Sequence, residues 1–430
     1  MKKILNPNQN TWEEILKSPT QSFSDIEETV KGIFKEVQQK GDVAVDKYTS
    51  FFDGITLESN TVTEKEIQKA ISLVSDELKE AIQTAKSNIE KFHTAQKTSK
   101  IEIETTEGVQ CWQEKRPIQK IGLYIPGGSA PLFSTVLMLA VPAQLAGCKE
   151  IVLCTPPDKK GKINPAIVYA ANLCGVTKII KVGGIQAIAG MTFGTVSIPK
   201  VYKIFGPGNQ FVTVAKQFAT QFGVAIDMPA GPSELLVFAD DSANPAFVAS
   251  DLLSQAEHGA DSQVILVTTS KSILNQVEKE VTMQLNDLPR KEIAKKAIIN
   301  SKLILVKSNQ LAIDIINEYA PEHFIVCSKD EDFFIQNVMN AGSVFIGNYT
   351  PESAGDYASG TNHTLPTNGY AKNYSGVNLD SFLKAMTFQK ITAKGIQNLG
   401  KTIEIMADAE GLQAHKNAVT IRLKSLENGN

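Results

Sequence analysis

The sequence predicts an α/β protein with two Rossmann-like units built on parallel sheets, an N-terminal helical segment and a small C-terminal tail domain. From about residue 117 onward, short apolar runs rich in β-branched residues alternate with helix-length segments. Turns rich in glycine or proline follow several of these runs. Such alternation is typical of βαβ units in parallel sheets. The apolar runs lie at 151–154, 179–182, 201–205, 235–238, 264–267, 303–306 and 344–346.

The chain of 430 residues is long enough for about three units of ~150 residues. Before the alternating region we expect one helix that ends at Gly41, and a second that begins with a capping box, Thr63-x-x-Glu66, and runs to about Phe92. The expected parts are an appended segment at 1–21, a discontinuous first α/β domain at 22–124 and 232–370, a second α/β domain at 125–231, and a tail domain at 371–430.

Composition and charge argue against nucleic-acid binding and membrane insertion. The chain carries 43 basic and 46 acidic residues, and only three of the basic residues are arginines. Arginine is the usual residue for bidentate contacts to phosphates and bases. The most apolar stretch, 136–147, is broken by Pro142 and is too short to span a bilayer. The N-terminus turns polar at once, so we expect a cytoplasmic protein.

Three glycine-rich turns follow predicted strands, at 124–129, 183–187 and 206–209. Ligands of parallel α/β sheets bind where strands end, and glycine allows backbone N–H groups to approach a phosphate. No turn matches G-x-G-x-x-G, because Phe211 stands where the third turn would need its last glycine. From pattern alone, these segments are either cofactor turns or simply tight βα turns.

Several polar residues are candidates for metal binding. Gln255 and His258 stand at i and i+3 near the end of a predicted helix, so they share a face. An imidazole and an amide oxygen can both ligate a divalent metal. Asp356 lies in a glycine-flanked loop, where aspartate is often only a turn residue.

Other polar residues are candidates for catalysis. Glu322 and His323 are neighbours at the entrance of a predicted strand, and both side-chain types can transfer protons near neutral pH. A further acid and histidine, Glu410 and His415, lie in the tail. Ser233 lacks a G-x-S-x-G context, which disfavours a serine nucleophile.

Taken together and in order, these segments resemble the motifs of histidinol dehydrogenase. The resemblance covers nearly the whole chain, at a length typical of that family, and suggests a bacterial-type, monofunctional enzyme. The motifs that carry it are GLYIPGG, GGIQAIA, FGPGN, DMPAGPSE, LLSQAEHG, YAPEH, SAGDYASGTNH and EGLQAHK.

The resemblance implies oxidation of L-histidinol to L-histidine through the aldehyde, with two NAD⁺ in succession and one Zn²⁺ per active site. Glu322 and His323 would carry the acid–base roles. His323 would take the alcohol proton and assist the second hydride transfer, and Glu322 would help activate water. The implied zinc ligands, which also contact substrate, are Gln255, His258, Asp356 and His415. The other implied substrate contacts are His323, Ser233, His363 and Glu410.

Tyr124, Gln186 and Asn209 match the family's cofactor contacts, at a site that is atypical for NAD. The family forms a domain-swapped homodimer, so His415 and Glu410 would come from the partner chain.

Two other readings stay open from the residues alone. A zinc hydrolase could use Glu322 with a metal-bound water and would need no NAD. A non-catalytic metal-binding or scaffold protein would tolerate loss of His323. The five cysteines contain no Cys-x-x-Cys, so we expect reduced, mostly buried thiols. None lies in a matched catalytic motif, so we expect Cys148 and Cys154 to be dispensable for activity.

Overall fold

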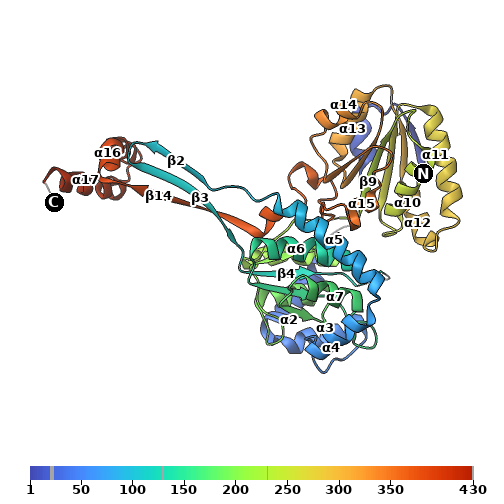
Figure 1. The fold of residues 1–430 in the computed structure, drawn as a ribbon, viewed down its shortest axis with the longest axis horizontal. Coiled ribbons are helices and arrows are strands. Elements are labelled where there is room, and N and C mark those ends of the chain that lie inside the picture. The colour runs from blue at the N-terminus through green and yellow to red at the C-terminus, as the bar shows by residue number, and fades with distance from the viewer. Residues whose placement is uncertain (20–23, 128–129, 230, 429–430) are drawn as a thin grey trace. The chain divides into compact units, whose positions relative to one another are not determined.

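The computed structural model describes residues 1–19, 24–127, 130–229 and 231–428, and the side chains of residues 24 and 25 are not described. The chain divides into two compact units (Figure 1). Unit 1 consists of residues 1–96 and 118–381, and unit 2 of residues 97–117 and 382–430. Among the described helices, none is both long and apolar enough to cross a membrane.

Unit 1 contains two parallel sheets, of which the first has six strands in the order β1-β11-β10-β9-β12-β13. All five neighbouring pairs are parallel. The strands are β1 (Lys2–Leu5), β9 (Glu234–Ala239), β10 (Gln263–Thr268), β11 (Lys302–Leu305), β12 (His323–Cys327) and β13 (Ser343–Ile346).

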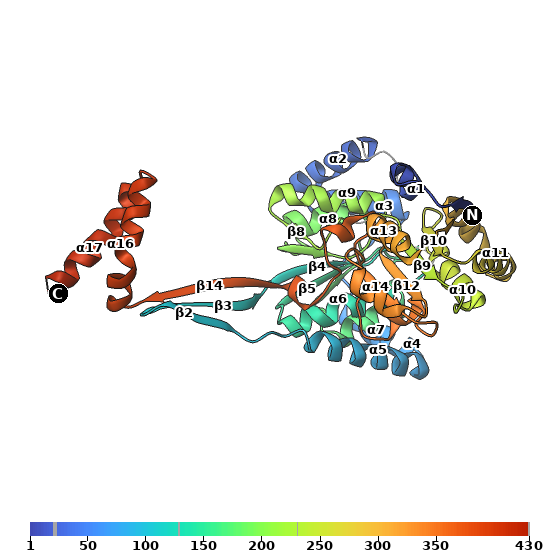
Figure 2. The ribbon, with the colours of Figure 1, turned by 90° about the horizontal axis from the view of Figure 1, so that it is seen from above.

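Helices cover both faces of the first sheet (Figure 2). Alternation along β9 shows the two faces: Leu235 and Val237 pack with α10, α11 and α12, whereas Leu236 and Phe238 pack with α1, α13 and α14. The bounds are α1 (Trp12–Leu16), α10 (Pro245–Ala256), α11 (Lys271–Leu285), α12 (Lys291–Asn300), α13 (Asn309–Tyr319) and α14 (Glu331–Asn337). A short helix, α15 (Glu352–Tyr357), follows β13.

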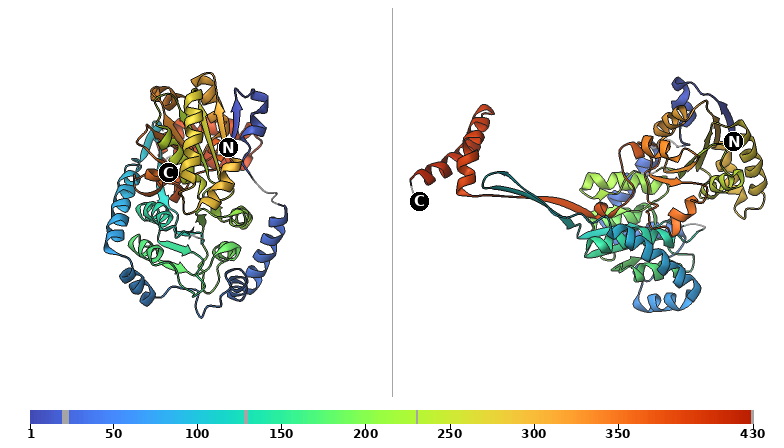
Figure 3. Two further views of the ribbon diagram at one scale, coloured as in Figure 1. Left: turned by 90° about the vertical axis from the view of Figure 1, so that its right-hand side faces the viewer. Right: turned by 45° about the horizontal axis from the view of Figure 1, so that its top comes forward.

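The second sheet of unit 1 has five parallel strands in the order β6-β5-β4-β7-β8. Its helices also lie on both sides (Figure 3). The strands are β4 (Lys120–Tyr124), β5 (Glu150–Cys154), β6 (Lys178–Ile180), β7 (Lys203–Phe205) and β8 (Ala225–Ile226). The helices are α2 (Ser24–Lys40), α3 (Asp42–Asp53), α4 (Glu64–Leu73), α5 (Asp76–Thr94), α6 (Phe133–Ala146), α7 (Pro165–Leu173), α8 (Gly184–Phe193) and α9 (Gln210–Ala219).

The boundaries expected from the sequence differ from this arrangement at its N-terminal part. The sequence pattern places residues 22–124 in the first α/β domain, but the apolar stripe of α2, including Val30 and Phe34, shares a core with the second sheet. The stripe shows which face of a helix is buried, but not which sheet buries it. The expected appended segment, 1–21, supplies β1, an edge strand of the first sheet.

The expected helix from the Thr63 box to Phe92 is two helices. The capping box is confirmed. The Thr63 hydroxyl accepts a hydrogen bond from the N–H of Glu66, and the Glu66 carboxylate accepts one from the N–H of Thr63. The helix ends at Leu73 because Val74 is extended, and Ser75 caps the next helix by accepting from the N–H of Leu78.

Unit 2 consists of a three-stranded antiparallel sheet and two helices that pack against each other (Figures 1 and 3). The sheet order is β14-β3-β2. The tail domain was expected at 371–430, but unit 2 begins later, at 382, and includes 97–117 because β3 pairs with β14 along its whole length. The elements are β2 (Ile101–Thr106), β3 (Val109–Pro117), β14 (Leu383–Ile391), α16 (Ala393–Ala409) and α17 (Gln413–Glu427).

Candidate active site

Glu322 and His323 lie at the amino end of β12, beside the amino end of β9. Glu234, the first residue of β9, holds both side chains through its backbone. Its N–H donates to Glu322 Oε2 at 2.8 Å, and its carbonyl oxygen lies 3.2 Å from His323 Nδ1. The side-chain amide of Gln255 donates to the same carbonyl at 3.2 Å and to Glu322 Oε2 at 3.3 Å. The parallel register of β9 and β12 therefore fixes the predicted acid–base pair.

Carboxylates surround the buried imidazole of His323. Glu322 Oε2 and Glu352 Oε1 lie 3.6 and 3.9 Å from Nδ1, and Asp356 Oδ1 lies 3.4 Å from Nε2. Burial alone would lower the pKa of His323, but the charges of Glu322, Asp356 and Glu352 outweigh it and hold the pKa well above its usual range. The site therefore favours a positive charge among these carboxylates.

Glu352 is a site residue that sequence reasoning missed. It lies at the start of α15 and is fully buried, and Ser254 Oγ donates to its Oε2 at 2.8 Å. Burial raises its pKa to about 8. Ligand atoms of His323, Glu352 and Asp356 lie within 4.8 Å of one another, so these three residues could hold a metal ion. Glu352 stands directly before the motif SAGDYASGTNH but outside it, and only the folded structure places it here.

The predicted ligands Gln255, His258 and Asp356 come from the end of α10 and from α15. Because Nε2 of the Gln255 amide donates these hydrogen bonds, its carbonyl oxygen, Oε1, is available to bind a metal. His258 is exposed and its Nδ1 lies 3.0 Å from the Ser254 carbonyl oxygen, which leaves Nε2 available.

The buried atoms at this site without a hydrogen-bond partner in the described part of the chain include Asp356 Oδ1, His323 Nε2 and Glu352 Oε1. Burial alone would raise the pKa of Asp356, but His323, with smaller effects of His363 and His258, lowers it. Asp356 is therefore an ionised carboxylate whose Oδ1 lacks a hydrogen-bond donor. It belongs both to the ligand set expected from the sequence and to the set formed with His323 and Glu352. These nitrogen and oxygen donors fit a divalent cation such as zinc.

His363 lies between this cluster and the second sheet. Its Nδ1 is 2.8 Å from the carbonyl oxygen of Asp356, and its Nε2 is 3.0 Å from Thr135 Oγ1 at the start of α6. Burial lowers its pKa. Ser233 directly precedes β9 and is therefore the chain neighbour of Glu234, whose backbone positions Glu322 and His323. Glu410 and His415 are exposed residues of unit 2, at the end of α16 and on α17.

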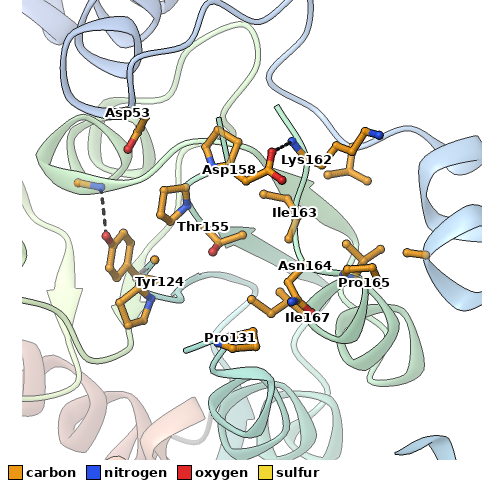
Figure 4. A pocket seen from close by; sticks show the side chains of 18 of the residues that line it. Asp53, Tyr124, Pro131, Thr155, Asp158, Lys162, Ile163, Asn164, Pro165 and Ile167 are labelled. Carbon is orange, nitrogen blue, oxygen red and sulfur yellow. Dashed lines mark hydrogen bonds between the residues drawn. The ribbon is translucent and has the colours of Figure 1, made fainter. Parts of the chain in front are cut away.

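A cavity of about 1000 Å³ lies at the carboxyl ends of the strands of the second sheet (Figure 4). Tyr124 and Asn209, two of the predicted cofactor contacts, line it. The Tyr124 hydroxyl accepts from the N–H of Gly184 at 3.1 Å, and Asn209 caps α9 by accepting from Val212 N at 3.1 Å. Burial raises the pKa of Tyr124 to about 12, so its hydroxyl is neutral.

Gln186, the third predicted cofactor contact, is not among the residues that line this cavity. Its side chain is fully buried near the start of α8, and neither amide atom has a hydrogen-bond partner within the described residues. Gly206 is the glycine whose conformation matters most, with φ +122°. A Cβ there would lie 2.1 Å from the backbone oxygen of Tyr124. Residues 128 and 129 of the glycine-rich turn at 124–129, and residue 230 of the motif DMPAGPSE, lie outside the described residues.

Comparisons with known proteins agree with this geometry. The histidinol dehydrogenase family model matches residues 16–423. The chain is 60% identical to the histidinol dehydrogenase of Bacteroides thetaiotaomicron over 99% of this chain and 100% of that protein, and 53% identical to that of Haemophilus influenzae over 96% of each. The crystal structure of histidinol dehydrogenase from Elizabethkingia anophelis matches with a TM-score of 0.97 and 60% identity, over 99% of each chain.

An acetylating aldehyde dehydrogenase from Geobacillus thermoglucosidasius, 13% identical with a TM-score of 0.50 over 88% of this chain and 94% of that one, shares only the fold. The family match covers nearly the whole chain, and the two named relatives are matched over nearly their full length, as expected for the monofunctional type. The match overturns both the hydrolase and the non-catalytic reading. The chain belongs to the histidinol dehydrogenase family.

Proposed function

We propose a mechanism for this chain as an NAD-dependent oxidoreductase that converts histidinol to histidine in histidine biosynthesis. The reaction passes through L-histidinaldehyde, with two NAD⁺ in succession and one zinc ion per site. The observation that carries this proposal is the buried Glu322–His323 pair, held by one backbone residue of β9 beside three candidate metal ligands.

His323 acts as the base in the alcohol oxidation. A metal ion bound at Asp356 would offset part of the carboxylate charge that otherwise keeps the imidazole protonated, so that His323 could accept a proton. Its Nδ1 faces the carbonyl oxygen of Glu234, so the proton on Nδ1 is donated there and Nε2 is left to accept the alcohol proton. Gln255 and Glu234 hold one oxygen of Glu322, which leaves its other oxygen to take a proton from the water that attacks the aldehyde. Both side chains are buried, and the reactive aldehyde is thereby shielded from bulk water.

Gln255, His258 and Asp356 of unit 1 would hold the zinc ion, together with His415 as the fourth ligand. When bound, zinc supplies a positive charge that orients the imidazole and amine of histidinol. Ser233 and His363 contact the substrate from unit 1. Glu410 binds the cationic end of the substrate.

Tyr124 and Asn209 bind NAD⁺ in the cavity at the carboxyl end of the second sheet. The role of Gln186 as a third cofactor contact stays a prediction, because its buried side chain does not line this cavity. The link 227–233 leaves β8 at this end and enters β9 at its amino end, beside Glu322. A link of this length spans at most about 25 Å. The contact of His363 with Thr135 also joins the Glu322–His323 cluster to the region of the second sheet.

The use of NAD⁺ is consistent with a cytoplasmic enzyme.

The active enzyme is a homodimer in which His415 and Glu410 come from the second copy. Unit 2 buries few side chains, and several of its large apolar residues are exposed. A second copy would cover such a surface. The exposed apolar residues include Ile101, Ile103, Met386, Ile391, Ile405, Met406 and Ile421.

Two experiments test this mechanism. The first counts NADH formed per L-histidinol consumed, with and without a chelator. We expect two NADH, loss of activity on chelation and recovery with zinc, whereas one NADH with free aldehyde would refute the role of Glu322.

The second experiment dissociates the inactive His323→Gln and His415→Ala dimers, mixes the two proteins and lets them associate again. Random pairing should restore about a quarter of the wild-type activity if sites are shared, because half of the dimers then hold one intact site. No recovery from demonstrably mixed dimers would refute the shared site.

A further inference from the structure

We propose that Asp53 selects the cofactor, because its carboxylate accepts hydrogen bonds from a ribose diol of NAD⁺ and repels the 2′-phosphate of NADP⁺. This inference rests on the proposed binding of NAD⁺ in the cavity of the second sheet. It assigns a specificity role to a residue that lies in none of the motifs on which the family resemblance depends.

Asp53 is placed to meet a ligand in this cavity. It is the last residue of α3 and lines the cavity together with Tyr124 and Asn209. Its Oδ2 is buried and has no hydrogen-bond partner in the described part of the chain. Figure 4 shows its carboxyl group on the side of the cavity where Tyr124 lies. A carboxylate with one oxygen buried and without a donor carries poorly compensated charge, so a ligand that donates to the part of the group facing the cavity would stabilise it.

The other two acidic groups of the cavity are already paired. Glu66 forms an ion pair with Lys181 at 3.0 Å, and Asp158 Oδ1 accepts from the backbone N–H groups of Lys160 and Lys162 at 2.8 and 2.9 Å. Asp53, in contrast, stands at the C-terminus of a helix, where the helix dipole disfavours a negative charge. Burial also raises its pKa. The donors of a vicinal diol would offset these costs, and a phosphate would increase them.

Two exposed lysines, Lys69 and Lys162, also line the cavity. In Figure 4, Lys162 lies beside Asp158, away from Asp53 and Tyr124. Lys162, which could meet a pyrophosphate, and Asp53, which could meet a ribose, therefore lie in different parts of the cavity. This separation matches a dinucleotide with an unphosphorylated ribose at Asp53.

The test compares kcat/KM for NAD⁺ and NADP⁺ in the zinc-loaded wild type, in Asp53→Asn and in the control Asp158→Asn. The control removes the same charge from the same cavity but keeps one acceptor oxygen for the loop. We expect Asp53→Asn to lower the NAD⁺/NADP⁺ ratio at least tenfold, on the order of one charge-assisted hydrogen bond. The ratio of the control should stay within about twofold of wild type. An unchanged ratio in Asp53→Asn, or an equal drop in both variants, overturns the proposal.

A second measurement needs no variant to fold. Calorimetry on the wild-type protein compares NAD⁺ with 2′-deoxy-NAD⁺ and with NADP⁺. We expect at least about tenfold weaker binding of both analogues. Equal affinity for NAD⁺ and NADP⁺ overturns the role of Asp53. Failure of the proposed function looks different, since histidinol would then yield no NADH and none of the dinucleotides would bind.

Discussion

Replacing Lys216 by methionine should destabilise the protein strongly, because it breaks a buried ion pair. Lys216 Nζ lies 2.5 Å from Asp227 Oδ1, and the two side chains are 4% and 1% exposed. Lys216 also donates to the carbonyl oxygen of Gly206 at 2.7 Å, while Asp227 Oδ2 accepts from the N–H of Gly206 at 2.8 Å. Loss of one partner of a buried pair typically costs about 3–5 kcal/mol, a large part of the ~5–15 kcal/mol that stabilises a domain.

The assay is the free energy of unfolding in urea, with a matched surface pair as control. Lys3 and Glu278 approach to 2.6 Å but are 40% and 43% exposed, so Lys3→Met should cost at most about 1 kcal/mol. Asp227→Asn added to Lys216→Met should recover part of the loss, since no unpaired buried charge then remains. If Lys216→Met lowers the free energy of unfolding no more than Lys3→Met does, burial does not set the energetic weight of this ion pair.

Three further predictions concern the sites. Cys154→Ala should keep most of the activity in the histidinol assay, because burial raises the pKa of this thiol and keeps it protonated; complete loss with intact folding would contradict this. Gly206→Ala should raise the KM for NAD⁺ at least tenfold, since the new Cβ would meet the Tyr124 backbone at the cavity. Burial raises the pKa of Glu234 from 4.5 to about 8, so the folded state binds its proton more tightly and the stability from this group is lost as pH rises between these values. In thermal melts, Glu234→Gln should therefore lose less stability than wild type from pH 5 to 8.

The sequence was sufficient to predict the two sheets, because central parallel strands are buried on both faces and appear as apolar runs. The runs at 235–238 and 264–267 correspond to β9 and β10, each one residue longer at both ends. The partners of the N-terminal elements were not predictable in this way. Whether α2 joins one sheet or the other depends on contacts with α8 and α9, far along the chain.

The site was predictable where a motif carries the chemistry. Glu322, His323, Gln255 and Asp356 do meet, as the ordered motifs suggested. Glu352 was not found, because a glutamate in the first turn of a short helix is common and its burial follows only from its contact with Ser254 on α10. The role of His415 stays a prediction, because it belongs to unit 2.

The proposed catalytic pair, Glu322 and His323, would allow the aldehyde to be oxidised without a cysteine. Ligands of parallel sheets usually bind at the carboxyl ends of strands, as in the cavity beside Tyr124. Glu322 and His323 instead stand at the amino end of β12, where Glu234 at the start of β9 orients both. A glutamate held in this way can direct water to the aldehyde without a covalent intermediate. The thiols of Cys148, Cys154, Cys174 and Cys327 have raised pKa values because they are buried, so none of these four is an activated nucleophile. Water activated at the amino end of β12 is therefore the route that the described side chains support.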